Sequence, residues 1–106
     1  MSVMEQNVID ASAITDDKNG LVLMISDHLD WKNEYEHLFI LQNKLNAYIN
    51  FCETKQYSAI YKNSEIQYAV FEIHFLHEPT SKAIKFLNQV QEQVGELGIK
   101  IKCILS

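Results

Sequence analysis

The sequence predicts an α+β fold, a two-layer α/β sandwich with the order ββαβαβ, in which two helices cover one face of a mixed four-stranded sheet. Three observations predict it. Apolar residues alternate in residues 68–76 and 99–105, as in half-buried strands, and the run 21–25 is apolar throughout. In residues 31–54 and 81–97 they recur every three or four positions, as in amphipathic helices. With 106 residues, 47% of them hydrophobic, and a single proline, the chain is expected to form one domain over residues 1–106.

Residues 8–25 predict a β-hairpin. The segment 8–14 alternates weakly, as an edge strand with one wet face does. The uniformly apolar segment 21–25 indicates a strand that is covered on both faces or central in the sheet. Between them, the sequence Asp-Asp-Lys-Asn-Gly at 16–20 is typical of a hairpin loop, in which Gly20 is expected to take a positive φ.

Residues 31–54 predict a long helix that lies diagonally across the sheet. At 1.5 Å per residue it would be roughly 30 Å long, about the width of the domain. Asp30 is the expected N-cap, because its carboxylate can accept from the free amides of the first turn. Asn33 with Glu36 three residues later forms a capping box and is the alternative.

The first half of the chain resembles a small bacterial family classed only as a domain of unknown function. The resemblance rests on these segments: Val8-Ile9-Asp10, Leu21-Val22-Leu23, Ile25-Ser26-Asp27-His28-Leu29-Asp30-Trp31, Glu36-His37-Leu38, Leu41-Gln42, Lys44-Leu45-Asn46-Ala47-Tyr48 and Phe51. It implies a bacterial source and carries no known activity, so no functional residue follows from it.

The second half predicts a strand, a helix and a strand after an irregular connection at 55–66, which has room for a short strand at 58–61. In the strand 68–76, alternate residues Ala69, Phe71, Ile73 and Phe75 share one face. Proline and hydroxyl residues at 79–81 predict the start of the second helix, and Gly98 its C-terminal cap.

The sheet face without helices is expected to be apolar at its centre. Its residues are Val22, Met24, Tyr68, Val70, Glu72, His74, Lys100 and Lys102. Because a monomer rarely exposes such a patch, we expect a homodimer. It would form through this face at Val22, Met24, Tyr68 and Val70, or through the flank of the first helix at Phe39, Ile40 and Phe51.

Composition excludes several classes of function. No apolar run approaches the ~20 residues of a membrane span, and no signal pattern precedes the domain, which predicts a cytoplasmic protein without membrane contact. Cys52 and Cys103 are expected to be buried free thiols. The net charge is −5 and all nine basic residues are lysine, which argues against nucleic acid. No motif for a cofactor occurs, so none is expected.

A candidate site lies where two strands end. If strands 21–25 and 68–76 run parallel, the polar turns after them share one edge of the sheet. That edge would gather Asp27, His28, Asp30, His77 and Glu78. One interpretation is a metal or acid–base site built from His28, His77, Asp27 and Glu78, and the other is that these side chains cap helices or are solvated.

The distribution of charge favours a protein-binding function over a metal-dependent or acid–base enzyme. Eight of the fourteen acids precede residue 37, against two lysines. We therefore expect an acidic edge formed by Asp27, His28, Asp30, Trp31 and Glu34 that contacts a basic protein partner. Trp31 either fills the core at the strand end or serves as a binding hot spot. The predicted function is a small acidic cytosolic protein-binding module without catalytic turnover, of immunity or antitoxin-like type. A metal-dependent or acid–base enzyme is the alternative.

Overall fold

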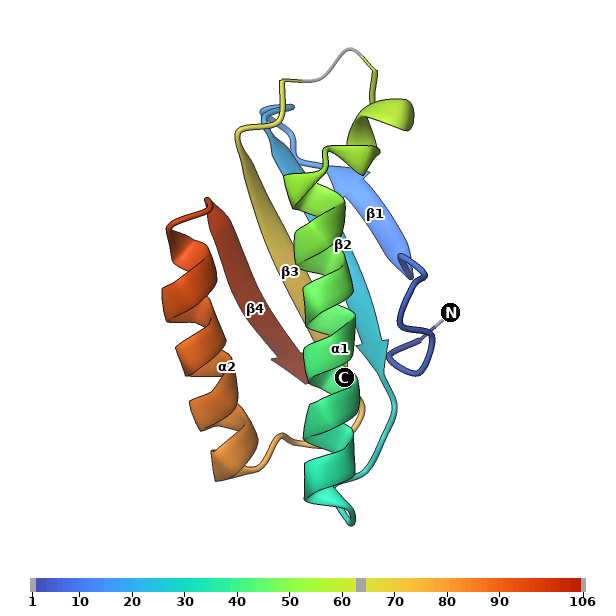
Figure 1. Cartoon of the computed structure of the whole chain (residues 1–106), viewed down its shortest axis with the longest axis vertical. Helices are drawn as coiled ribbons and strands as arrows, with labels where there is room; N and C mark the ends of the chain where they lie inside the picture. Colours follow the sequence, from blue (N-terminus) through green and yellow to red (C-terminus); the bar gives the residue numbers. More distant parts are fainter. Residues whose placement is uncertain (1, 63–64, 106) are drawn as a thin grey trace.

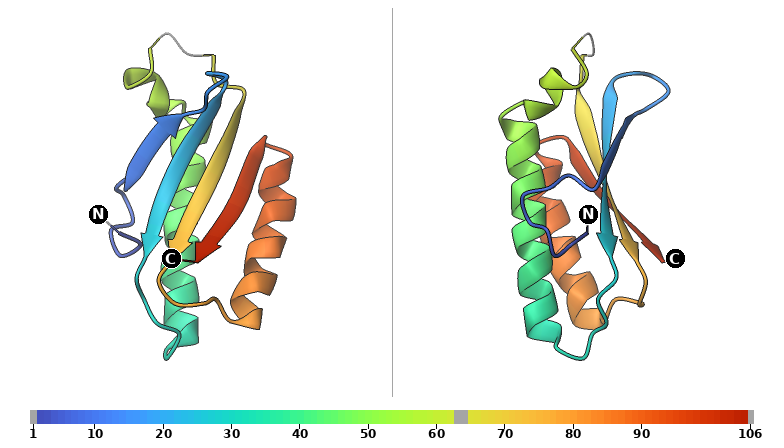
Figure 2. Two further views of the ribbon diagram at one scale, coloured as in Figure 1. Left: turned by 180° about the vertical axis from the view of Figure 1, so that it is seen from behind. Right: turned by 90° about the vertical axis from the view of Figure 1, so that its right-hand side faces the viewer.

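A computed structural model, which describes residues 2–62 and 65–105, confirms the predicted ββαβαβ sandwich (Figure 1). The elements are β1 (Ala11–Ile14), β2 (Gly20–Asp27), α1 (Glu34–Glu53), the 3₁₀ turn η1 (Gln56–Ala59), β3 (Tyr68–Phe75), α2 (Ser81–Gly95) and β4 (Ile99–Leu105). The strands lie in the order β1-β2-β3-β4, with β1 antiparallel to β2 and the other pairs parallel. Both helices lie on one side of the sheet (Figure 2).

The core lies between α1 and the central strands. In register across the sheet, Leu23, Phe71 and Ile101 are neighbours on the helix side. Phe71 is fully buried and Leu45 of α1 is 1% exposed, as the periodicity predicts. The ring of Tyr48 meets Phe71 edge to face with centroids 5.7 Å apart. The alternation of β3 is complete, because every second residue is buried from one end to the other.

The first hairpin differs from its prediction in two details. The strand β1 has four residues and begins only at Ala11. The positive φ of the loop falls on Lys18, at 65°, and Gly20 is already the first residue of β2. Glycine is favoured at position 20 for another reason: a Cβ there would overlap the ring of Tyr68. Close approach of a side chain, and not turn geometry, therefore selects glycine.

The prediction that Asp30 caps α1 is wrong, and the alternative cap is the observed one. Asn33 Oδ1 accepts from the Glu36 amide at 3.4 Å, and Asn33 Nδ2 donates to Glu36 Oε2 at 2.8 Å. Asp30 instead accepts from the amide of Lys32 at 3.1 Å, which stabilises the turn before the helix. The chain passes through this turn from the sheet layer to the helix layer. Helix α1 therefore begins later than the apolar spacing indicates.

Three further expectations need correction. Residues 58–61 do not form a strand, because Lys55 takes a left-handed φ of 55° and the chain then closes the 3₁₀ turn η1. Helix α2 ends at Gly95, and Gly98, with φ 76°, opens the turn into β4. Cys103 is exposed rather than buried, whereas Cys52 is half-buried, and both thiols are free. No helix among the described residues is long and apolar enough to cross a membrane.

Candidate functional site

The junction between β2 and α1 is built on a buried pair of ionisable side chains. Asp27 is the last residue of β2 and is 1% exposed, and His37 in the first turns of α1 is 2% exposed. Their side chains meet with Nε2 of His37 2.6 Å from Oδ2 of Asp27. The second oxygen of Asp27 accepts from the amide of Leu29 at 3.1 Å. Both oxygens of Asp27 are therefore occupied within the protein.

The hydrogen bonds of His37 fix where its protons lie. Its Nδ1 is 2.9 Å from the carbonyl of Asp30, which can only accept, so Nδ1 carries a proton. A bare Nε2 would then turn its lone pair toward Oδ2 of Asp27. One proton therefore lies in that contact, whether the pair is imidazolium with carboxylate or imidazole with carboxylic acid. In either state the pair has no net charge.

Trp31 holds this junction against the turn after β3. Its ring stacks on His37 with centroids 3.6 Å apart and planes 19° from parallel. Its indole N–H donates to the carbonyl of His77 at 3.3 Å, and its ring lies 6.1 Å from that of Phe75. These contacts give the half-buried Trp31 a structural role, which was one of the two interpretations of its sequence position.

A buried ion pair, which sequence reasoning missed, holds α1 against the N-terminal segment. Lys44 lies in the middle of α1 and is fully buried. Its Nζ donates to the carbonyls of Glu5 and Val8, both at 2.6 Å, and to Oδ1 of Asp10 at 2.8 Å. All three ammonium protons thus have an acceptor. The signal was present in the sequence, because Lys44 stands within the apolar stripe of the helix.

Tyr48, one turn further along α1, extends this network into the sheet. Its hydroxyl donates to the carbonyl of Met24 at 2.5 Å and accepts from the amide of Asp10 at 2.9 Å. Oδ2 of Asp10 accepts from the amide of Ser26 at 2.9 Å. Burial raises the pKa of the Tyr48 hydroxyl well above its usual value, so it stays protonated. Residues 5–10 are therefore held by hydrogen bonds to both α1 and β2.

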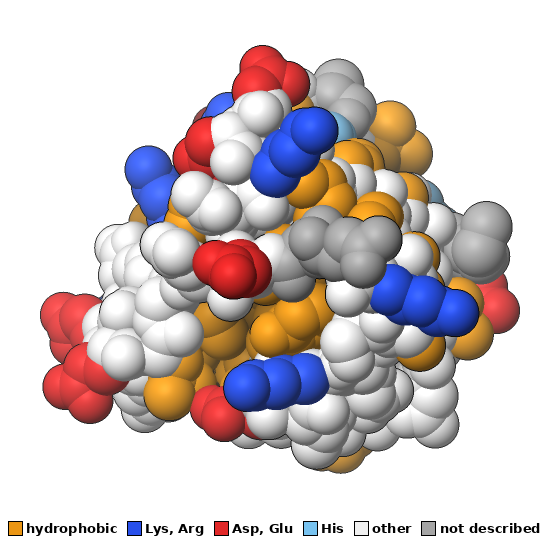
Figure 3. All heavy atoms as spheres, turned by 90° about the horizontal axis from the view of Figure 1, so that it is seen from above, with side chains coloured by type: hydrophobic (Ala, Val, Ile, Leu, Met, Phe, Trp, Pro, Cys, Tyr) orange, Lys and Arg blue, Asp and Glu red, His pale blue; other side chains and the backbone are white. Residues whose placement is uncertain are grey.

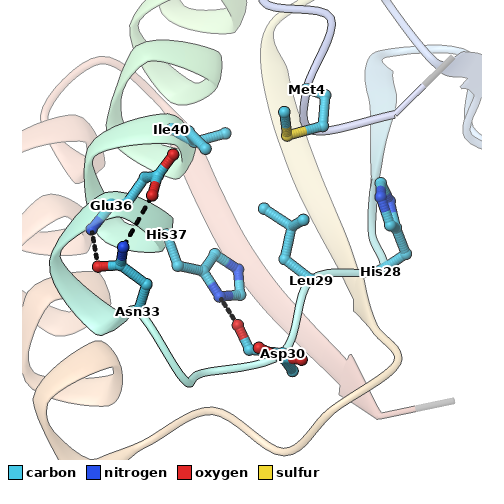
Figure 4. Close-up of a pocket in the computed structure, with 8 residues that line it drawn as sticks. All are labelled: Met4, His28, Leu29, Asp30, Asn33, Glu36, His37 and Ile40. Atoms are coloured by element: carbon cyan, nitrogen blue, oxygen red, sulfur yellow. Dashed lines mark hydrogen bonds between the residues drawn. The ribbon is translucent and has the colours of Figure 1, made fainter.

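A hollow of about 380 Å³ opens between these two networks (Figure 4). Its apolar wall is formed by Met4, Leu29 and Ile40, whose side chains point toward one another in Figure 4. Two exposed acidic residues, Asp30 and Glu36, also line it. The remaining lining residues are His28, Asn33 and His37. The buried Lys44 network positions the segment that carries Met4, and His37 positions Asp30.

Comparison with known families matches the whole chain, residues 1–106, to a family of unknown function, DUF6572. The chain belongs to this family. The match confirms the resemblance to an uncharacterised family. Comparison with curated proteins and with solved structures gave no match. Because DUF6572 carries no residue roles, the site rests on its geometry.

The structure brings together only part of the predicted acidic edge. His28 and Asp30 line the hollow, whereas Asp27 is buried and Glu34 lies outside the lining. Trp31 is half-buried against His37. The partner-binding hypothesis therefore keeps two of its five residues at the hollow, and sequence reasoning missed Glu36, Leu29, Ile40 and Met4.

The proposed metal set has no support in the geometry. His77 and Glu78 are exposed on the turn after β3, and Asp27 is committed to His37. Within residues 2–62 and 65–105, no group of three or more His, Cys, Asp or Glu side chains is arranged to hold a metal ion. Of the predicted set His28, His77, Asp27 and Glu78, Asp27 is buried with both oxygens already bonded.

Proposed function

We propose that this protein is a protein-binding module that receives a basic side chain of a partner protein in the hollow beside the N-terminal end of α1. The observation that carries the proposal is the lining of this hollow, which combines an apolar wall with two exposed acidic residues, Asp30 and Glu36. Lysine and arginine combine an apolar stem with a cationic head, so their shape and charge match such a site. Binding to it needs no chemical turnover.

The charges at the two ends of the molecule support a binding site beside the N-terminal end of α1. The end that carries η1 shows lysine and acidic side chains interspersed around apolar ones (Figure 3). At the hollow the charged lining residues are Asp30 and Glu36, both negative. A field of one sign speeds the encounter with an oppositely charged partner, and it does so less at high salt.

The hydrogen bonds of His37 favour binding over acid–base catalysis. A histidine that acts as a general base must present one ring nitrogen to the substrate. In His37 one nitrogen faces Asp27 and the other faces the carbonyl of Asp30. The pair therefore resembles a catalytic dyad in composition only.

The finer parts of the proposal concern the setting. An immunity or antitoxin-like role in a bacterial cytoplasm suits a small acidic binding domain, and two free thiols fit a reducing compartment. We further propose a homodimer through the open sheet face, where Val22, Met24 and Val70 are only partly covered. Of the alternative helix flank, Phe51 is buried and Phe39 is 62% exposed, which weakens that surface as a continuous patch.

The test of the proposed function uses a panel of nonapeptides with one central arginine or lysine between apolar residues. Their dissociation constants are measured by fluorescence anisotropy at low and high salt. The variant Asp30→Asn/Glu36→Gln keeps the local hydrogen bonds and removes both charges. It should weaken the best binder about threefold to thirtyfold and flatten its salt dependence.

The matched control is Glu92→Gln/Glu96→Gln, which removes two exposed charges from the C-terminal end of α2. It should leave the dissociation constant within about twofold. Equal losses in the two double variants would show that net charge, and not the hollow, attracts the peptides. Tighter binding of peptides with a neutral central residue would also contradict the proposal.

A further inference from the structure

The outward crest of α1 exposes no charged side chain over residues 38–51. The only charged residue in that range is Lys44, which is buried. Within that range the crest consists of Phe39, Gln42, Asn46 and Asn50, all exposed and spaced three or four residues apart. Solvent-facing helix surfaces normally carry charges. An exposed aromatic ring followed by three carboxamides is therefore an unusual surface for a protein with 22% charged residues.

Two hollows flank this crest, and neither is lined by a charged residue. One, of about 520 Å³, is lined by residues of α1 and the N-terminal segment, and the other, of about 190 Å³, is lined by residues of α1 and α2. Carboxamides form the polar lining of both. In the first they are Gln6, Asn7, Asn46, Asn50 and Gln56, and in the second Gln42, Asn46, Gln89 and Gln93. Apolar floors complete them, with Phe51 in the first and Phe86 in the second.

The carboxamides of the crest are available to a ligand. Within the described part of the chain, the side chains of Gln42, Asn46 and Asn50 make no hydrogen bond to the protein. Each offers one acceptor and two donors. Such a surface matches a neutral ligand that presents donors and acceptors together, and it offers no counter-charge to an ionised one.

An extended polypeptide presents donors and acceptors at the spacing of this crest. Residues four apart on a helix are separated by about 6 Å along its axis. Every second residue of an extended chain, whose N–H and C=O point the same way, repeats at about 6.6–6.8 Å. The side chains of such a chain point alternately to its two faces. With one backbone edge on the crest, they would fall to either side of α1, where the two hollows lie.

A pairing of this kind is already present in the protein, between α2 and β4. Gln91 of α2 donates through Nε2 to the carbonyl of Ile99 at 3.0 Å and accepts through Oε1 from the amide of Ile101 at 2.7 Å. One helical carboxamide thus binds the backbone edge of the extended strand β4. On the crest, Gln42, Asn46 and Asn50 repeat the same chemical group.

From this geometry we infer a second binding site, for an uncharged extended segment of a partner polypeptide that lies along α1. Its backbone hydrogen-bonds to Gln42, Asn46 and Asn50, and its alternate side chains enter the two flanking hollows. The site shares no lining residue with the acidic hollow, which is lined by the first two turns of α1. Phe39, which is 62% exposed, extends the contact surface toward the N-terminal end of the helix.

The test begins with a phage-displayed library of random ten-residue peptides, selected on the full-length protein. The counter-selection uses Asn46→Ala/Asn50→Ala. Because alanine favours helix more than asparagine does, this variant keeps α1 folded, which circular dichroism verifies. Enriched peptides should be poor in charged residues. Their dissociation constants should rise at least about tenfold on the double variant, through two lost hydrogen bonds.

Asn88→Ala is the matched control, because Asn88 is an exposed carboxamide of α2 that lines neither hollow. It should change binding by less than about twofold. N-methylation of the backbone amide at every second residue of the best peptide should abolish binding, whereas N-methylation at the residues between them should leave binding intact. The inference would be overturned if none of the enriched peptides depended on the two carboxamides. It would also be overturned if binding stayed unchanged whichever position was N-methylated. Binding of maltohexaose, lost on the double variant, would assign the site to a neutral sugar instead.

Discussion

Replacing Lys44 with methionine should remove a large part of the stability of this domain. Lys44→Met keeps the length and helix preference of the side chain but leaves the carboxylate of Asp10, itself only 5% exposed, without its cation. Breaking a buried ion pair by removing one partner typically costs about 3–5 kcal/mol. The carbonyls of Glu5 and Val8 lose their donor in the same step. A domain of this size has a margin of about 5–15 kcal/mol, so the loss is a large fraction of the total.

The assay is urea unfolding followed by the fluorescence of the single tryptophan, Trp31, which stacks on His37 in the folded state. The midpoint should fall by at least about 1 M for Lys44→Met. Lys85→Met is the control, because Lys85 is an exposed lysine of α2, and it should stay within about 0.5 kcal/mol of wild type.

A second variant separates the ion pair from the rest of the network. Lys44→Met/Asp10→Asn removes both charges, so it should be more stable than the sum of the single changes implies by about 0.5–3 kcal/mol. The stability of this double variant should stay below that of wild type, because the carbonyls of Glu5 and Val8 remain without their donor. Equal midpoints for Lys44→Met and Lys85→Met would refute the reasoning, since they would mean that Lys44 reaches solvent at no cost.

Four further outcomes follow from the fold. Phe71→Ala should lower the free energy of unfolding by about 3–5 kcal/mol, and a midpoint that barely moves in urea would place the ring outside the core. Asn33→Ala should cost about 0.5–2 kcal/mol as the loss of the α1 cap, whereas Asp30→Ala should cost less than about 0.5 kcal/mol, and the reverse order in thermal unfolding would restore Asp30 as the cap. Burial raises the pKa of the Cys52 thiol to about 11, so at pH 8 only about one such thiol in a thousand is ionised; iodoacetamide should therefore label the other cysteine first, as mass spectrometry would show. Light scattering at high micromolar concentration should give twice the chain mass and Val22→Lys should give a monomer, so a wild-type monomer would contradict the dimer through the open sheet face.

The fold was predictable because its signals are local and mutually consistent. The alternation of residues 68–75 assigns a face to every residue of β3, and the structure confirms each assignment. The parallel pairing of β2 with β3 follows from the helix between them. Helix boundaries and turns were less predictable, because several residues could fill the same local role. Asp30 and Asn33 are both good N-caps, and only the path from the sheet to the helix layer decides between them.

The two buried pairs of ionisable side chains, His37 with Asp27 and Lys44 with Asp10, could have been suspected from the sequence, but their partners could not be predicted from it. His37 and Lys44 both fall on the stripe of α1 whose other buried members are apolar. A polar group on such a stripe must find a partner, because burying it unpaired is costly. Which acid meets which base depends on contacts between residues far apart in the chain, such as Lys44 with Asp10. Periodicity says nothing about these distances.

The same two pairs reduce the number of acidic side chains in the N-terminal third that a partner can meet. Asp10 and Asp27 are two of its eight acids, and both are internal and paired with a basic side chain. A charge count therefore overstates the negative field that a partner meets. What remains at the hollow is a smaller and better defined feature, the two carboxylates of Asp30 and Glu36. The paired acids act on this feature indirectly, because Lys44 fixes the segment that carries Met4 and His37 fixes the turn that carries Asp30. If the hollow binds a basic segment, its shape depends on charges that the partner never touches.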